Sequence, residues 1–188
     1  MGPSLRGVCP IAVLFALVAI PAGAQPDDPK PTGSIRADAA DQQPNLHRWR
    51  MTRHGFGRLK VGLTRAKIER RTGRRLRFIY NTGPCAIWSI RGVRGLSIMT
   101  ISGRLARVDA YRGTWRTSEG IRIGDTEQKV RERYPRLRTA PHPYVPDGQY
   151  LIVRGAKRRV VFETDGNDRV TSFRGGRVPP VMYIEGCA

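Results

Sequence analysis

The chain has 188 residues, of which 39% are hydrophobic and 7% aromatic, and this length fits one domain or two very small ones. It carries 34 Lys and Arg against 15 Asp and Glu, a formal net charge of +19, and 29 of these cations are Arg. Such a composition excludes a collagen, a coiled coil, a disulfide-dense miniprotein and a polytopic membrane protein.

The first 24 residues are predicted to be a secretory signal peptide. Arg6 is their only charged residue, and the apolar stretch 8–20 is too short for a comfortable membrane span. A small-residue A-x-A pattern ends at Ala24 and predicts cleavage after it. We therefore expect a periplasmic or secreted protein with no transmembrane segment after signal cleavage. An uncleaved N-terminal anchor is the alternative.

Two cysteines remain in the mature chain, because Cys9 lies in the signal peptide. An even pair of cysteines in an exported protein favours an internal disulfide between Cys85 and Cys187. Two free thiols, or a bond to another chain, are the alternatives.

Residues 25–55 are rich in Pro, Asp, Gln and small residues and show no apolar period. This composition predicts a flexible N-terminal linker. The pattern changes at Phe56, so residues 56–188 are expected to form the folded domain.

The domain contains two similar units that are offset by 62 residues. LKVGLTRAKIERR at 59–71 aligns with IRIGDTEQKVRER at 121–133, and RVDAYRG at 107–113 aligns with RVTSFRG at 169–175, without a gap. Similarity at a fixed offset indicates an internal repeat. We place the two repeats at about residues 58–113 and 120–175.

Each repeat is expected to begin with a short helix and to continue as an antiparallel meander. Thr64 and Thr126 are the predicted helix N-caps, because a threonine hydroxyl can accept a backbone N–H of the first turn. Hairpin signals at Ser102-Gly103 and Asp165-Gly166 separate the last two strands of each repeat. The predicted strands cover 86–91, 96–101, 105–111, 150–154, 159–164 and 169–174, with a last strand at 181–184. The predicted fold class is α+β, with the helices packed on one face of a shared sheet.

The pattern resembles the BLIP-like superfamily, which includes tandem-repeat β-lactamase inhibitor proteins and SmpA/OmlA-type outer-membrane assembly lipoproteins. The resemblance covers about residues 56–188. It rests on V-G-L-T at 61–64, I-G-D-T at 123–126 and the closing Arg-Val pairs at 107 and 169. It implies a curved sheet whose concave face grips a partner protein. The mature chain lacks the lipoprotein cysteine, and no interface residue of the inhibitors can be transferred to it.

Four aromatic residues form two pairs under the repeat offset, namely Trp88 with Tyr150 and Tyr111 with Phe173. On an open sheet face these four residues, flanked by Arg107 and Arg169, would form a binding row, because Trp, Tyr and Arg are enriched in interface hot spots. Packing of the aromatic residues in the core is the alternative.

Arginine clusters predict a second kind of site, for anions. A cationic field attracts polyanions, and arginine binds phosphate and carboxylate bidentately. A solvated surface in an Arg-rich chain is the alternative. The candidate anion-binding residues are Arg70, Arg71, Arg74, Arg131, Arg133, Arg158 and Arg159.

Catalysis is the least favoured function. His142 lies near Tyr144, Asp147 and Tyr150, which suggests acid–base chemistry, but no nucleophile has a recognisable setting. The stretch 165–168 lacks the spacing of a calcium loop, so we expect neither a metal nor a cofactor.

The sequence therefore predicts an exported, non-catalytic protein that binds a protein or envelope partner through its sheet face. A cationic binder of envelope polyanions, such as lipopolysaccharide, acidic lipid or glycan, is the alternative, and a hydrolase that uses His142 is less favoured. Specific nucleic-acid binding is not expected.

Overall fold

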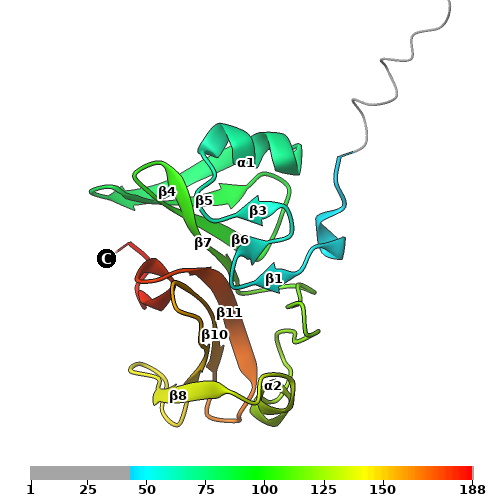
Figure 1. Ribbon diagram of the computed structural model, residues 1–188, viewed down its shortest axis with the longest axis vertical. Helices are drawn as coiled ribbons and strands as arrows, with labels where there is room; N and C mark the ends of the chain where they lie inside the picture. The colour runs from blue at the N-terminus through cyan, green and yellow to red at the C-terminus, as the bar shows by residue number, and fades with distance from the viewer. Residues whose placement is uncertain (1–42, 188) are drawn as a thin grey trace, which may run out of the picture.

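The computed structural model describes residues 43–187, and the predicted signal peptide and most of the predicted linker lie outside this range. The described part of the chain is built mainly from β-strands, arranged as an eight-stranded and a three-stranded antiparallel sheet (Figure 1). The predicted α+β fold with helices packed on one face is therefore wrong. The described residues contain only two α-helices, of eight and seven residues, and such short helices cannot cover a sheet of this width.

The large sheet consists of two four-stranded meanders that are joined at their last strands. Its order is β4-β5-β6-β7-β11-β10-β9-β8, so β7 pairs with β11 at the centre, and β4 and β8 form the two edges. The strands are β4 Leu76–Thr82, β5 Cys85–Ile90, β6 Leu96–Ile101, β7 Arg104–Ala110, β8 Leu137–Pro141, β9 Gln149–Val153, β10 Arg158–Thr164 and β11 Val170–Arg177. The interior strands confirm the six strands predicted from apolar alternation, with end points that differ by up to three residues.

A short helix precedes each meander, and the two helices lie at opposite ends of the molecule (Figure 1). Helix α1 spans Arg65–Thr72 and α2 spans Glu127–Arg133. The hydroxyl of Thr126 accepts a hydrogen bond from the Lys129 N–H, as predicted for a cap. Thr64 occupies the N-cap position of α1 but makes no side-chain cap hydrogen bond, so its predicted hydroxyl cap is absent.

The small sheet comes from the end of the predicted linker and the start of the predicted domain. Its strands are β1 Met51–Thr52, β2 Gly55–Phe56 and β3 Leu59–Lys60. Met51, Phe56 and Leu59 are fully buried. Ordered structure therefore starts before residue 56, because these large apolar side chains cover the core face of the large sheet.

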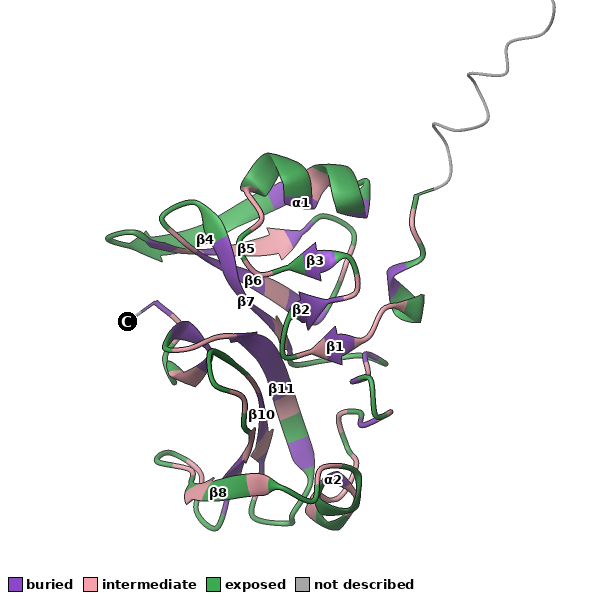
Figure 2. Ribbon diagram, in the orientation of Figure 1, coloured by how far each residue is buried: buried purple, intermediate pink, exposed green. Residues whose placement is uncertain are grey.

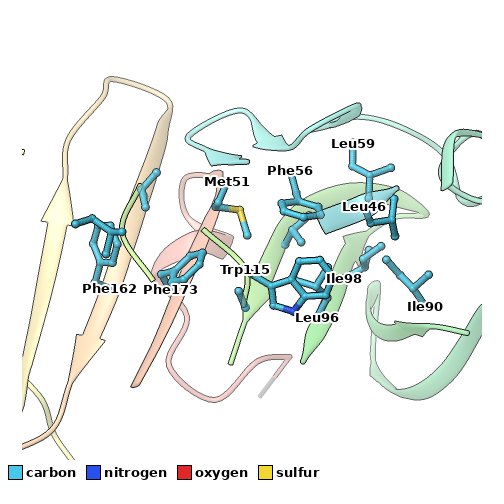
Figure 3. Close-up of a cluster of buried hydrophobic side chains, with 14 of the residues drawn as sticks. Leu46, Met51, Phe56, Leu59, Ile90, Leu96, Ile98, Trp115, Phe162 and Phe173 are labelled. Carbon is cyan, nitrogen blue, oxygen red and sulfur yellow. The ribbon is translucent and has the colours of Figure 1, made fainter. Parts of the chain in front are cut away.

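The main core lies between the small sheet and one face of the large sheet, and each helix contributes a single buried aliphatic side chain to it, Ile68 or Val130. Figure 3 shows Phe56 and Leu59 from the small sheet above Leu96, Ile98 and Trp115. Phe162 and Phe173 continue this core into the second meander, with ring centroids 5.9 Å apart. One apolar layer thus spans the two meanders.

The opposite face of the large sheet is covered in part by the C-terminal segment, which we define as residues 178–187. The strand predicted at 181–184 is wrong, because the chain forms a 3₁₀-helix, η2, at Pro180–Met182. Pro179 and Pro180 have no backbone N–H and cannot extend a strand ladder. A disulfide between Cys85 and Cys187 fixes the end of this segment to β5, which confirms the predicted pairing.

None of the helices in residues 43–187 is long and apolar enough to cross a membrane.

Candidate functional site

The four predicted aromatic binding residues do not form one row. Trp88 is half-buried on the core face, where its indole N–H donates to the Thr100 hydroxyl at 2.9 Å. Phe173 is fully buried, and Tyr150 is buried on the opposite face. Tyr111 alone among the four is exposed, to 51%. An interface built from all four side chains on one face is therefore excluded in this structure.

The two arginines predicted to flank that row have other contacts. Arg107 is buried, and its guanidinium donates to the carbonyl oxygens of Pro180 and Tyr183 at 2.9 and 2.7 Å. Its Nε also lies 2.9 Å from a carboxylate oxygen of Asp109. Arg107 therefore binds this chain's own C-terminal segment. Arg169 is exposed just before β11, in an isolated bridge to Thr126, and its Nη1 donates to the Gly124 carbonyl at 3.3 Å.

The predicted anion-binding arginines are spread over the molecule and do not form one site. Arg131 is paired with Glu127 at 2.6 Å, and Arg71 donates to a backbone carbonyl at 2.7 Å. Arg74 and Arg159 are half-buried, and the Nε atom of each has no hydrogen-bond partner among residues 43–187. The remaining three, Arg70, Arg133 and Arg158, are exposed on separate elements.

A different group of arginines surrounds a hollow of about 780 Å³ at one end of the first meander. We call this site the arginine hollow and define it by Arg77, Arg91, Arg94, Tyr111 and Arg112. The start of β4, the end of β5, the turn before β6 and the end of β7 all meet here, because neighbouring strands are antiparallel. All five side chains are exposed.

Gly95 shapes the arginine hollow. It has a φ of +73°, and a Cβ at this position would lie 2.0 Å from the carbonyl oxygen of Arg112. Only glycine permits this close approach without strain. The Tyr111 N–H donates to the Gly95 carbonyl at 3.0 Å, which fixes Tyr111 beside the turn.

Among residues 43–187, no carboxylate lines the arginine hollow. Several acidic side chains of the described part of the chain are instead engaged elsewhere, such as Asp109 with Arg107 and Asp125 with Lys129. Like charges also lie close together elsewhere on the surface. For example, the nearby Arg122 guanidinium is the main cause of the lowered pKa of Arg116. The hollow is thus a concave cationic surface whose charge is not balanced from within, and such a surface attracts anions.

The second meander carries a smaller hollow at the corresponding end. Arg53, Arg133, Arg136 and Arg154 line it around Tyr134. The site therefore has the same residue types as the arginine hollow, and of its arginines Arg133 belongs to the candidate anion-binding residues predicted from the sequence.

His142 packs beside an ion pair on the face of the large sheet that Tyr150 occupies. Its ring stacks on Tyr150, with centroids 4.7 Å apart, and its Nε2 lies 3.9 Å from a Glu163 oxygen. The Glu163 carboxylate is already paired with the Arg174 guanidinium. This arrangement holds the histidine by stacking, and no hydroxyl or thiol nucleophile hydrogen-bonds to it among the contacts of the described residues. Residues 43–187 also contain no group of three or more His, Cys, Asp or Glu that could hold a metal ion.

Of the arginine hollow, only Tyr111 belongs to the candidate site residues that the sequence predicts, although Arg77 lies in one of its basic clusters. The available signal was positional, since Arg91, Arg94 and Arg112 flank glycine turns between successive predicted strands. In an antiparallel meander, every second turn lies at the same end of the sheet.

Searches of protein-family models, curated proteins and solved structures find no match to this chain.

Proposed function

We propose that the chain is an exported, non-catalytic protein that binds envelope polyanions through the arginine hollow. The observation that carries the proposal is a concave site with four exposed guanidinium groups and, in the part of the chain that the structure describes, no lining carboxylate. Guanidinium groups form paired hydrogen bonds with phosphate and carboxylate oxygens. Polymers or surfaces that carry many such groups are the ligands that match this site.

The overall charge supports the same ligand class. The formal net charge of +19 gives a long-range attraction for anions and raises their rate of encounter. Tyr111 adds a phenol in the hollow that can donate a hydrogen bond to an anionic oxygen.

Binding of a protein partner through an aromatic row on the sheet is supported less well. Phe173 and Tyr150 are buried, so a partner would contact them only after the core or the C-terminal segment had moved. We therefore favour the polyanion over the aromatic sheet interface.

Salt-dependent binding tests the proposal. The mature chain from residue 25 onward would be titrated into fluorescently labelled long-chain inorganic polyphosphate at several salt concentrations. We expect the logarithm of the affinity to fall linearly with the logarithm of salt concentration, by about one unit of slope for each phosphate contact. An affinity that is independent of salt, or no binding at low salt, would contradict the proposal.

A matched pair of triple variants locates the site. Arg91→Gln, Arg94→Gln and Arg112→Gln together remove three charges from the arginine hollow. Arg58→Gln, Arg70→Gln and Arg138→Gln remove three exposed charges from other places. We expect the hollow variant to reduce the salt slope by about three and the control by less than one. Equal losses in both variants would show that total charge, and not the hollow, binds the polyanion.

A further inference from the structure

Three consecutive large apolar residues are exposed on the edge of the large sheet. Phe78, Ile79 and Tyr80 of β4 are 51%, 45% and 41% exposed. Figure 2 shows β4 as an exposed strand in a hairpin that projects from the body of the molecule. Isolated exposed apolar side chains are ordinary, but a contiguous group marks an interaction surface. We call Phe78, Ile79 and Tyr80 the apolar edge.

The local backbone explains why these residues are exposed. Within the described part of the chain, β4 pairs only with β5, so its outer edge has no neighbouring strand there. The register of this pair shifts between Phe78 and Tyr80, and Ile79 has no opposite residue. A bulge of this kind turns neighbouring side chains away from the regular alternation. Phe78 packs edge-on against Trp88, with ring centroids 5.4 Å apart, and the Tyr80 hydroxyl lies beside Cys187, yet all three residues remain exposed along the edge strand.

The C-terminal segment extends this apolar surface. Its backbone lies against Tyr80, whose phenol oxygen is 3.5 Å from the Cys187 N–H nitrogen. Tyr183 and Ile184 of the same segment are exposed to 38% and 44%. Figure 2 shows the end of this segment on the same side of the molecule as the β4 hairpin.

Arginines continue directly from the apolar edge. Arg77 precedes Phe78 on β4 and belongs to the arginine hollow. Arg75 precedes the strand, and its side chain is 78% exposed although it lies 3.9 Å from a Glu69 oxygen. Asn81 and Thr82 at the far end of β4 carry no charge. The apolar edge is thus an apolar strip that has cations at one end and no acidic residue within β4.

We propose that the apolar edge docks on an anionic lipid surface. Phe78, Ile79 and Tyr80 enter the boundary between head groups and acyl chains, and the arginine hollow binds the head-group phosphates through Arg77 and its neighbours. Interfacial binding of this kind combines buried apolar area with attraction to anionic lipid. The proposal rests on the proposed function, because it identifies the envelope polyanion as a lipid surface instead of a soluble polymer.

Vesicle flotation tests the proposal with the mature chain. The vesicles contain phosphatidylcholine alone or phosphatidylcholine with about 30 mol% phosphatidylglycerol, which supplies the negative surface potential. We expect binding only to the anionic vesicles. The double variant Phe78→Ser with Ile79→Ser should weaken this binding by at least about tenfold, since the lost apolar area no longer leaves water. Its affinity for long-chain polyphosphate should not change.

A conservative variant provides the matched control. Phe78→Leu with Ile79→Val keeps an apolar strip and should retain vesicle binding within about threefold. A thermal melt checks that both double variants are folded. Should the serine pair not fold, Ile79→Ser alone is used, with Ile79→Trp as the second measurement, because a tryptophan that enters the head-group region shifts its emission to shorter wavelength.

The outcomes separate this inference from the proposed function. Polyphosphate binding without vesicle binding overturns the lipid surface and leaves the proposed function intact. Unchanged vesicle binding by a folded serine variant also overturns the inference, because the arginines alone would then suffice. If the parent chain binds neither polyphosphate nor anionic vesicles, the proposed function is contradicted. A parent dimer that dissociates in the serine variant would show that a second copy covers the apolar edge, and this result overturns the lipid proposal.

Discussion

Replacement of Arg107 by alanine should release the C-terminal segment and destabilise the whole domain. The side chain is only 6% exposed and is bonded to three groups, namely the Asp109 carboxylate and the carbonyl oxygens of Pro180 and Tyr183. Removal of the guanidinium leaves a carboxylate at 16% exposure without its partner, together with two carbonyls that lose a charged donor.

The magnitude follows from these three contacts. Hydrogen bonds to a charged group contribute about 1.5–3 kcal/mol each, so the three would sum to more than about 4 kcal/mol. Part of that loss is recovered, because the carbonyl of Tyr183 becomes accessible to water when the segment moves. Loss of one partner of a buried ion pair costs about 3–5 kcal/mol, and we expect a loss in this range for Arg107→Ala.

Urea unfolding followed by circular dichroism measures the change, with the disulfide intact in both proteins. Arg104→Ala is the control, since Arg104 lies on the same strand but is exposed, and it should change stability by about 0.5 kcal/mol or less. The double variant Arg107→Met with Asp109→Leu should recover much of the loss, because it leaves no unpaired buried charge. A loss below about 1 kcal/mol for Arg107→Ala would refute the idea that this arginine anchors the segment.

Three further predictions concern stability. The pair Cys85→Ala with Cys187→Ala opens a loop with a sequence separation of 102 residues and should cost about 4–5 kcal/mol in urea unfolding; a parent protein that loses no stability on reduction would contradict this. The Glu69 carboxylate accepts a hydrogen bond from the first backbone amide of β4, which lowers its pKa below the ordinary 4.5. The contribution of this carboxylate to the free energy of unfolding is thus present above about pH 4.5 and is lost as the pH falls through the lowered pKa. Glu69→Gln should lower the free energy of unfolding by about 1 kcal/mol at pH 7. If the stability difference between this variant and the parent does not shrink in acid, the charged hydrogen bond is contradicted. Gly95→Ala should lower the free energy of unfolding by more than about 1 kcal/mol and should also lower the affinity for polyphosphate. Gly103→Ala is the control, because its Cβ position has open space around it, and it should leave that affinity unchanged. If the two variants bind polyphosphate equally well, Gly95 does not shape the site.

The sequence predicts the interior of the large sheet well and its edges poorly. Interior strands such as Leu96–Ile101 alternate apolar residues on a buried face, and that alternation is visible in the sequence. Strand β4 has six exposed residues out of seven, and β8 contains Pro141, so neither shows the pattern of a half-buried strand. The two-residue strands of the small sheet bury single residues such as Met51 between polar neighbours, which leaves no period to detect.

The predicted aromatic row failed for a physical reason that one pair illustrates. The 62-residue offset aligns Trp88 with Tyr150 in the sequence. In the structure, however, Trp88 packs on the core face of the large sheet and Tyr150 packs on the other face. A displacement of one residue along a strand reverses the face of every side chain. Similarity over a whole repeat therefore locates strands but does not fix their faces. The sequence does not locate the arginine hollow for a related reason, because the site depends on the relative positions of four strand ends.

The bond between Cys85 and Cys187 turns most of the fold into a covalent ring. This ring includes β5, β6, β7 and every element of the second meander. A single cut by a protease inside the ring, for example in the exposed stretch 111–114, opens the ring without dividing the molecule into two chains that can diffuse apart. The disulfide keeps the two fragments joined and therefore at a high effective concentration, so the cut protein can keep its sheet assembled. A cut before residue 85 lies outside the ring and leaves the part of the chain that precedes it held by non-covalent contacts alone.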